Sequence, residues 1–389
     1  MYTVRLKRNE EKNIINGFPW VYANEVSSIS GKDIQGSVCR VEAFDGRFIG
    51  IGFINHASKI IVRMLSNKEE DVNESFFYQR IKKSNDYRLE LGYQDNYRVC
   101  FSESDFLPGL IVDKYGDYLS CQFLSLGMEI RKEMIVSILV SLFNPKGIYE
   151  RSDVPVREKE GLKERKGILY GDIPEKVIIC ENDLKLYVDI INGQKTGYFL
   201  DQKENRNNIK YYVKDKTVLD CFCNVGGFSL CASKFGAKKV TSLDISERAL
   251  AEVNENAKLN NIGNIETVCC DVFEKLREYK KEKKSFDCII LDPPAFIKNV
   301  DSVKNGYNGY VDINTLALKL VSDGGYLITC SCSQHLTMPL FMRMIEESIN
   351  RAKLKVKIVE MRYQAKDHAS LANLPESLYL KVAVMKVVG

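Results

Sequence analysis

The chain has 389 residues, which is long enough for two or three domains that each bury a core of their own. Its formal net charge is only +4 and no segment is a basic tail, so a nucleic-acid-binding surface would have to be assembled by folding. No run of about 18 apolar residues is present and the N-terminus lacks an apolar signal core, so we expect no membrane span. Several cysteines lie inside predicted strands, which indicates reduced thiols and a cytoplasmic location. The 12 cysteines form no Cys-x-x-Cys pair and only three histidines are present, so we expect no metal.

Three parts differ in their sequence pattern. Residues 1–66 consist of short apolar runs separated by turn signals, which is typical of a small β-barrel. Residues 67–180 begin with a helical, connecting segment and continue as an α+β unit, with a hairpin around Lys114–Asp117 and a helix near 128–143. Residues 181–389 alternate strand-like and helical runs, which predicts an α/β domain with a Rossmann-like sheet.

The first informative stretch of the third part is Val218–Phe228. A buried strand is expected over 216–220 and a helix over 228–235, and Gly226 and Gly227 let the backbone between them turn tightly. Asp220 would then face the ammonium group of a bound S-adenosylmethionine. The Gly-x-Gly-x-x-Gly pattern of a dinucleotide site is absent, and an ordinary strand–turn–helix remains the alternative for this stretch alone.

Two further strands are also expected to end in acids. Asp244 closes the strand 237–244 and lies 24 residues after Asp220, a spacing suited to hydrogen bonds with ribose hydroxyls. Asp271 closes the run 265–271, where it would lie beside an adenine amine. A single aspartate at a strand end is usually a turn former or helix cap, but three in register favour a nucleoside cofactor.

Two stretches near the C-terminus carry groups for chemistry on a planar base. Asp292-Pro293-Pro294-Ala-Phe296 follows the strand 286–291, and its prolines stiffen the loop and remove two backbone donors. The loop carbonyls and the Asp292 carboxylate could then accept a base amine, and Phe296 offers a stacking face. A rigid loop without a catalytic part is the alternative. Cys330 and Cys332 follow at the end of the strand 325–330.

These stretches together resemble the bacterial ribosomal RNA large subunit methyltransferase I type, which forms 5-methylcytosine in large-subunit ribosomal RNA. The likeness covers nearly the whole chain. It extends over the five stretches above and also over 17–22, 106–115, 193–206, 306–314 and 375–381. The combination of Thr-Gly-Tyr-Phe-Leu-Asp-Gln at 196–202 with Ser-Cys-Ser at 331–333 is more specific than the Asp-Pro-Pro loop.

The resemblance implies a mechanism, a partner and an arrangement of domains. Cys332 matches the nucleophile that adds to carbon 6 of cytosine, and Cys330 is a nearby decoy that we expect to be more buried. Residues 1–66 match a PUA domain, an RNA-binding pseudobarrel, and the middle domain would frame the RNA cleft by analogy only. The implied partner is 23S ribosomal RNA or a large-subunit assembly intermediate, and a homodimer remains open.

The expected site has catalytic, substrate-binding and cofactor-binding residues. Cys332 and Asp292 are the expected catalytic residues, and Pro293, Pro294 and Phe296 would contact the base. The residues expected to bind S-adenosylmethionine are Asp220, Phe222, Asn224, Gly226, Gly227, Asp244, Asp271, Asp292, Phe199 and Gln202. Two other functions remain open, namely a guanine-N7 or other nitrogen RNA methyltransferase on the same scaffold and a non-catalytic RNA-binding ribosome-assembly factor.

Overall fold

A computed structural model describes residues 1–388, and the chain divides into two compact units. The first unit comprises Met1–Ile179, Val188–Leu200 and Lys366–Ser377. The second comprises Cys180–Tyr187, Asp201–Ala365 and the residues from Leu378 to the end of the described chain. Because neither unit is one continuous stretch, the division of the sequence into 1–66, 67–180 and 181–389 stays a prediction.

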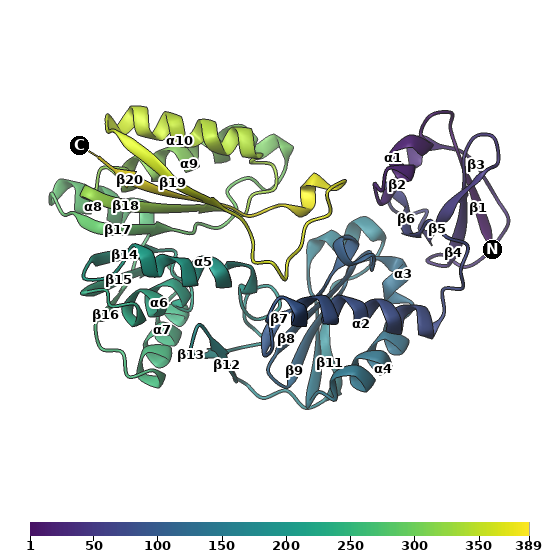
Figure 1. Ribbon diagram of the computed structural model, residues 1–389, viewed down its shortest axis with the longest axis horizontal. Helices are drawn as coiled ribbons and strands as arrows, with labels where there is room; N and C mark the ends of the chain where they lie inside the picture. The colour runs from purple at the N-terminus through teal and green to yellow at the C-terminus, as the bar shows by residue number, and fades with distance from the viewer. Residues whose placement is uncertain (389) are drawn as a thin grey trace. The chain divides into compact units, whose positions relative to one another are not determined.

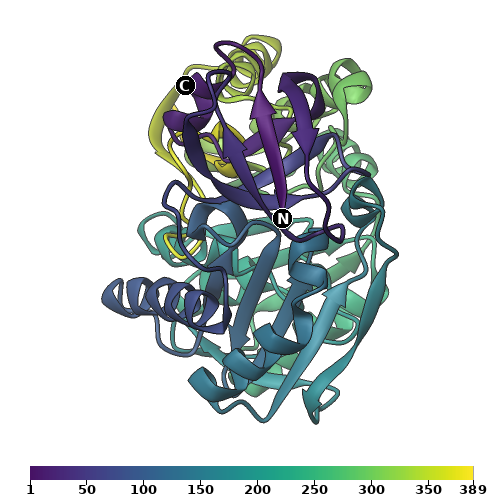
Figure 2. The same ribbon diagram turned by 90° about the vertical axis from the view of Figure 1, so that its right-hand side faces the viewer.

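The N-terminal part of the first unit is a six-stranded sheet whose core is built from alternating apolar residues (Figures 1 and 2). The strand order is β2-β6-β5-β4-β1-β3, and β1 runs parallel to β4 but antiparallel to β3. Val4, Leu6 and Val62 are completely buried at its centre, as alternating apolar side chains should be. The elements are β1 (Tyr2–Leu6), α1 (Glu11–Ile15), β2 (Trp20–Tyr22), β3 (Val26–Ser30), β4 (Val38–Glu42), β5 (Phe48–Ile54) and β6 (Ile60–Ser66).

The rest of the first unit is built around a five-stranded sheet in the order β11-β10-β9-β8-β7. The expected hairpin is confirmed, since β8 and β9 are antiparallel with Tyr115 opposite Tyr118. The helix expected near 128–143 is divided into α3, which Ser125 caps, and the longer α4. The elements are α2 (Glu74–Glu90), β7 (Asn96–Phe101), β8 (Leu110–Tyr115), β9 (Tyr118–Phe123), α3 (Leu126–Glu129), α4 (Lys132–Phe143), β10 (Gly147–Ser152) and β11 (Arg165–Gly171).

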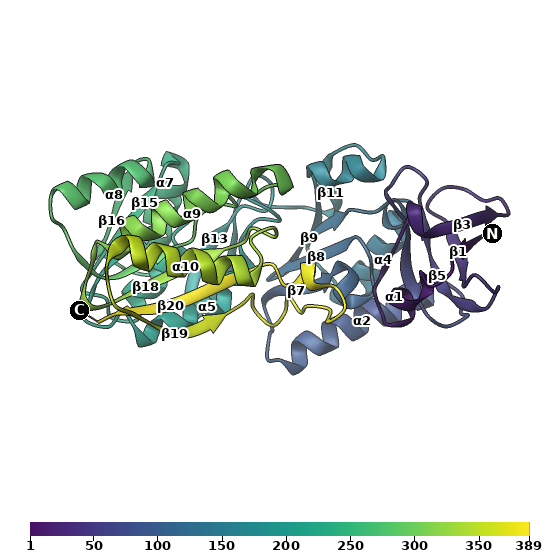
Figure 3. The same ribbon diagram turned by 90° about the horizontal axis from the view of Figure 1, so that it is seen from above.

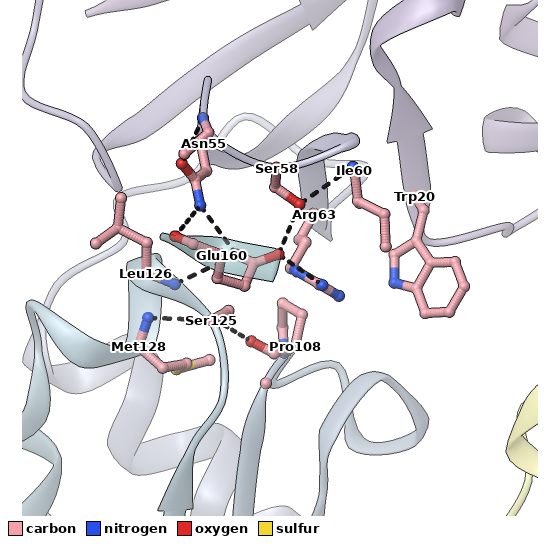
Figure 4. Close-up of polar contacts among 12 residues, drawn as sticks. Trp20, Asn55, Ser58, Ile60, Arg63, Pro108, Ser125, Leu126, Met128 and Glu160 are labelled. Atoms are coloured by element: carbon pink, nitrogen blue, oxygen red, sulfur yellow. Dashed lines mark hydrogen bonds and ion pairs between the residues drawn. The ribbon is translucent and has the colours of Figure 1, made fainter. Parts of the chain in front are cut away.

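A buried ion-pair network joins β6 to two short 3-10 turns of the α+β part, η2 (Ser102–Asp105) and η3 (Pro155–Glu160) (Figure 4). Arg63 on β6 donates from Nη2 to Glu160 Oε1 at 2.9 Å and from Nη1 to Glu103 Oε1 at 2.6 Å. Glu160 also accepts from Asn55 Nδ2 at 3.1 Å. Glu103 accepts the indole N–H of the partly buried Trp20 at 2.8 Å, so this contact fixes the edge of the indole ring. The N-terminal sheet and the α+β part therefore share one polar junction.

The second unit is a doubly wound sheet of seven strands in the order β16-β15-β14-β17-β18-β20-β19, and β20 is antiparallel to both neighbours. A two-stranded hairpin, β12 (Val177–Glu181) and β13 (Leu184–Val188), precedes it in the chain. The strands are β14 (Thr217–Cys221), β15 (Lys239–Asp244), β16 (Ile265–Cys269), β17 (Phe286–Leu291), β18 (Val321–Ser331), β19 (Val356–Arg362) and β20 (Lys381–Val387). The α/β Rossmann-like expectation is confirmed.

Helices cover both faces of this sheet (Figures 1 and 3). One face packs against α8, α9 and α10, and its core includes Leu219, Ile289 and Leu327 from the strands. The other face is covered by α5, α6 and α7. The helices are α5 (Lys203–Asn208), α6 (Gly227–Lys234), α7 (Glu247–Leu259), α8 (Val272–Lys281), α9 (Val303–Leu318) and α10 (Met338–Ala352). Within residues 1–388, no helix is long and apolar enough to cross a membrane.

Candidate active site

The predicted acids and the predicted cysteine lie at one edge of the seven-stranded sheet. Strands β14 to β18 are mutually parallel, so their carboxyl ends meet at the same edge. Asp220 lies near the end of β14 and Asp244 ends β15, while Asp271, Asp292 and Cys332 follow β16, β17 and β18. The chain order reverses between β14 and β17, and open α/β sheets bind ligands at such a switch point.

The loop between β14 and α6 has an unusual backbone. Phe222, Asn224 and Gly226 have φ values of 62°, 48° and 86°, all in the left-handed region. Two of these residues are not glycine, and such strain is concentrated in ligand-binding loops. A Cβ atom on Gly226 would lie 3.0 Å from both γ-carbons of Val253 on α7, so only glycine fits there without displacement. Gly227 is the first residue of α6, as the sequence predicts within one position.

Asp220 is a buried carboxyl with an unfilled acceptor. Its Oδ2 accepts from Ser229 Oγ at 2.6 Å, whereas its Oδ1 has no hydrogen-bond partner among the described residues. Burial, and to a smaller extent the nearby carboxylates of Asp292 and Asp244, raise the pKa of Asp220 to about 7. A cation that reached Oδ1 would satisfy both the charge and the orphaned acceptor. Asp220 therefore fits the ammonium end of an amino-acid cofactor.

Asp244 and Asp271 both organise backbone. Asp244 Oδ2 accepts from Asn224 N at 2.9 Å, and its Oδ1 accepts from Ser246 N at 2.9 Å. Asp271 is the N-cap of α8 and accepts from Glu274 N at 3.0 Å. Both acids therefore have the structural role of a turn former or helix cap that the sequence left open as an alternative. A carboxylate offers about four lone-pair sites, so each of them can still accept a ligand hydroxyl or amine.

The Asp-Pro-Pro loop is held from two sides. Gln202 Nε2 donates to Asp292 Oδ1 at 3.0 Å. The half-buried ring of Phe296 lies 4.6 Å from the Tyr310 ring, centroid to centroid. A Cβ on Gly306 of α9 would lie 2.6 Å from the Phe296 carbonyl oxygen, so this glycine lets α9 approach the loop. Pro293 is buried and Pro294 is exposed.

A second set of contacts joins this loop to the turn that carries Cys332. Ser333 Oγ accepts from Ile297 N at 3.2 Å and shares a hydrogen bond of 2.8 Å with the Tyr310 hydroxyl. The Cys332 thiol is partly exposed, whereas Cys330 is completely buried. Burial raises the pKa of the Cys330 thiol well above its ordinary value, which keeps it protonated. The expectation that Cys330 is the more buried of the pair is confirmed.

Lys381 is a residue of this site that the sequence reasoning missed. It begins β20, opposite Ser331 on β18, and its side chain is buried. Its Nζ donates to the carbonyl oxygens of Ser333 and Tyr379, each at 2.8 Å. The pKa of Lys381 is lowered to about 8, because the effect of burial outweighs the attraction to Cys332, which acts to raise the pKa. Lys381 lies inside the stretch 375–381, but only the pairing of β18 with β20 shows its role.

Two other expectations concern Phe199 and Gln202, which lie outside the strands of this sheet. Phe199 belongs to the first unit, so its expected contact with the cofactor stays a prediction. Gln202 belongs to the second unit, where it binds Asp292 as described above. Within residues 1–388, no group of three or more His, Cys, Asp or Glu side chains could hold a metal ion.

The sheet order and the row of acids at its carboxyl edge define a class, the Rossmann-like S-adenosylmethionine-dependent methyltransferases. The family models agree, since a PUA-like domain matches residues 4–67 and an S-adenosylmethionine-dependent methyltransferase matches residues 164–369. A crystal structure of a proposed methyltransferase complexed with SAH is also similar, with a TM-score of 0.87 and 25% identity over 100% of both chains. S-adenosylmethionine is therefore the cofactor of this chain.

Relatives of nearly equal length give the particular family. The chain is 40% identical over 390 residues to ribosomal RNA large subunit methyltransferase I of Aeromonas salmonicida, covering 98% of each chain. It is also 40% identical over 392 residues to the protein of the same name from Vibrio campbellii, covering 99% of each chain. The chain belongs to the ribosomal RNA large subunit methyltransferase I family.

Proposed function

We propose that this protein methylates carbon 5 of a cytidine in 23S ribosomal RNA through a covalent adduct with Cys332. The names of the relatives supply the ribosomal RNA substrate. The observation that supports the carbon-5 chemistry is the partly exposed residue Cys332, whose neighbour Ser333 accepts a hydrogen bond from Ile297 N, just after the Asp-Pro-Pro loop. A methyltransferase acting on a ring nitrogen needs such a loop but has no use for a nucleophile.

Most of the proposed cofactor-binding residues lie at the carboxyl ends of the parallel strands. S-adenosylmethionine supplies an electrophilic methyl group on its sulfonium sulfur. The buried Asp220 would accept the ammonium group through its unpartnered Oδ1. Asp244 would accept from the ribose and Asp271 from the adenine amine, while the left-handed loop around Asn224 brings backbone close to the ligand. We include Phe222, Gly226, Gly227, Gln202 and Phe199 in this proposed set.

The proposed reaction begins with the Cys332 thiolate, because carbon 5 of cytosine is itself a poor nucleophile. The thiolate adds to carbon 6, which forms an S–C bond and makes carbon 5 an enamine-like centre. Carbon 5 then uses its enamine electron pair to form a bond to the methyl group, and the bond from that methyl group to the sulfonium sulfur breaks with its electrons left on the sulfur. A base removes the carbon-5 proton, the S–C bond breaks, and the electron pair returns to the sulfur as thiolate. Cys332 is thus regenerated.

The target base must be presented outside a helix. Carbons 5 and 6 are unreachable in a stacked duplex, so the cytidine is flipped or single-stranded. We infer that Asp292 and the carbonyl groups of Pro293 and Pro294 would receive its amine, and that Phe296 would offer a ring for stacking. The PUA-like part would add RNA contacts outside the seven-stranded sheet.

Nucleoside analysis of the product tests this proposal. The protein is incubated with S-adenosylmethionine and unmodified ribosomal RNA, and the RNA is digested to nucleosides for mass spectrometry. The expected product is 5-methylcytidine. Production of 7-methylguanosine, or of another nitrogen-methylated nucleoside in its place, would establish the nitrogen-methyltransferase alternative. No methylation together with no S-adenosylhomocysteine binding in calorimetry would instead support a non-catalytic assembly factor.

A further inference from the structure

The turn that carries Cys332 is fixed by a buried lysine. Lys381 stands opposite Ser331 in the β18–β20 pairing, so its side chain starts beside the last residue of β18. Its Nζ reaches the carbonyl oxygen of Ser333, the residue directly after Cys332, at 2.8 Å. A second bond of 2.8 Å goes to the carbonyl oxygen of Tyr379. Two of the three ammonium protons are therefore bound to neutral carbonyl groups.

A buried lysine that contacts only carbonyl oxygens would be an expensive structural anchor. Neutral carbonyls do not compensate the charge of an ammonium group, and burial accordingly disfavours its charged form. The opposing influence on Lys381 is its attraction to Cys332. A neutral side chain such as glutamine could bind one of the same carbonyls without this cost, so the charge beside Cys332 points to an electrostatic role for Lys381.

Ionisable groups on several surrounding elements interact electrostatically with Cys332. Lys381 comes from β20, Tyr310 from α9 and Cys330 from β18. Burial raises the pKa values of the Tyr310 hydroxyl and the Cys330 thiol, so both are neutral near pH 7. On the adjoining loop, the Asp292 carboxylate is bound by Gln202. Among these groups, Lys381 carries a positive charge, whereas Tyr310 and Cys330 are neutral.

We propose that the Lys381 ammonium stabilises the thiolate form of Cys332 and thereby prepares the nucleophile for addition to the base. This inference rests on the proposed function, in which Cys332 is the nucleophile. When the thiolate forms, the S–H bond breaks, its electron pair stays on Sγ and the proton passes to solvent, which the partly exposed side chain contacts. Lys381 acts through Cys332 and is a positioning residue in this sense.

The test measures the thiolate directly, without RNA or methyl transfer. The full-length protein is alkylated with iodoacetamide between pH 5 and pH 10, and the rate at the Cys332 peptide is followed by mass spectrometry. Lys381→Met should slow alkylation of Cys332 at pH 7 by about tenfold, because a nearby lysine typically lowers a thiol pKa by about one unit or more. Wild type and variant should converge above about pH 9, where Lys381 has itself lost its proton.

Two further variants separate charge from anchoring. Lys381→Gln keeps a donor for the Ser333 carbonyl but carries no charge, so it should slow alkylation as Lys381→Met does. Lys386→Met removes a lysine from the other end of β20 and should leave the rate unchanged. S-adenosylhomocysteine affinity within about twofold of wild type shows that each variant retains the fold of the cofactor site, and alkylation of the exposed Cys180 serves as internal reference.

The outcomes separate this inference from the proposed function. Equal slowing in the Met and Gln variants supports the inference. A normal alkylation rate in Lys381→Gln would overturn the inference. If Lys381→Met is nevertheless slowed, Lys381 serves only to anchor the Cys332 turn. If Lys381 has no effect on alkylation but Cys332→Ala abolishes 5-methylcytidine formation, only the inference fails. If Cys332→Ala retains normal methylation, the proposed function fails whatever the alkylation rates show.

Discussion

The buried Asp220 carboxyl predicts a specific pH dependence for cofactor binding. Its pKa of about 7 means that the carboxyl is neutral at pH 6 and charged at pH 8. An ammonium group bound at Oδ1 favours the charged form, so binding below pH 7 must first remove a proton. The affinity for S-adenosylhomocysteine should therefore rise by about tenfold between pH 6 and pH 8. Asp220→Asn should bind more weakly at pH 8 and lose this pH dependence.

The raised pKa of Asp220 also makes the folding stability depend on pH. Between about pH 4 and pH 7 the folded chain holds a proton on Asp220 that the unfolded chain has released, so stability falls as pH rises. With a folded pKa of about 7, the loss from this group between pH 5 and pH 8 is on the order of 3 kcal/mol. Asp220→Asn should remove that component.

Two measurements on wild type and Asp220→Asn at three pH values would check both predictions. Calorimetry gives the affinity for S-adenosylhomocysteine, and chemical denaturation gives the free energy of unfolding. The variant serves as the control for other groups that titrate in this range. An affinity that changes equally with pH in the two proteins would refute the assignment of Asp220 to the ammonium group. An equal pH dependence of the free energy of unfolding would show that the carboxyl is not buried as a neutral acid.

Two other predictions concern an acid of the cofactor site and the junction of the first unit. Asp244→Ala should weaken S-adenosylhomocysteine binding by more than about tenfold in calorimetry, because a hydrogen bond to a charged group is lost. Unchanged affinity with lowered thermal stability would mean that Asp244 serves only the two backbone N–H groups that it binds. Arg63→Met should lower the free energy of unfolding by about 3–5 kcal/mol, since Glu103 and Glu160 would remain buried without their cation. Its S-adenosylhomocysteine affinity should match wild type, and an unaltered unfolding curve would contradict a stabilising role for the junction.

Local sequence patterns predicted the part of the site that lies at the ends of parallel strands. Apolar runs that end in Asp220, Asp244 and Asp292 were enough to locate these acids at strand ends. A strand that is buried on both faces has a continuous apolar pattern, and polar residues mark its end. A serine shortly after such a strand end is a typical helix cap, and Ser246 Oγ accepts from Ala249 N at 3.2 Å at the start of α7.

Features that depend on long-range pairing could not be predicted in this way. Lys381 meets the Cys332 turn only because β20 inserts antiparallel between β18 and β19, and a chain separation of 48 residues from Ser333 leaves no local signal. The Arg63–Glu160 pair spans 97 residues for the same reason. The placement of 366–377 in the first unit likewise depends on tertiary contacts and not on periodicity.

The most direct test of the central claim is to trap the covalent adduct. RNA carrying 5-fluorocytidine at the target should link covalently to the wild-type protein in the presence of S-adenosylmethionine, because fluorine cannot leave carbon 5 as a proton does. Mass spectrometry should place the adduct on the peptide that contains Cys332, and Cys332→Ala should form no adduct and no 5-methylcytidine while still binding cofactor. An adduct on a different residue, or normal turnover by Cys332→Ala, would contradict the account.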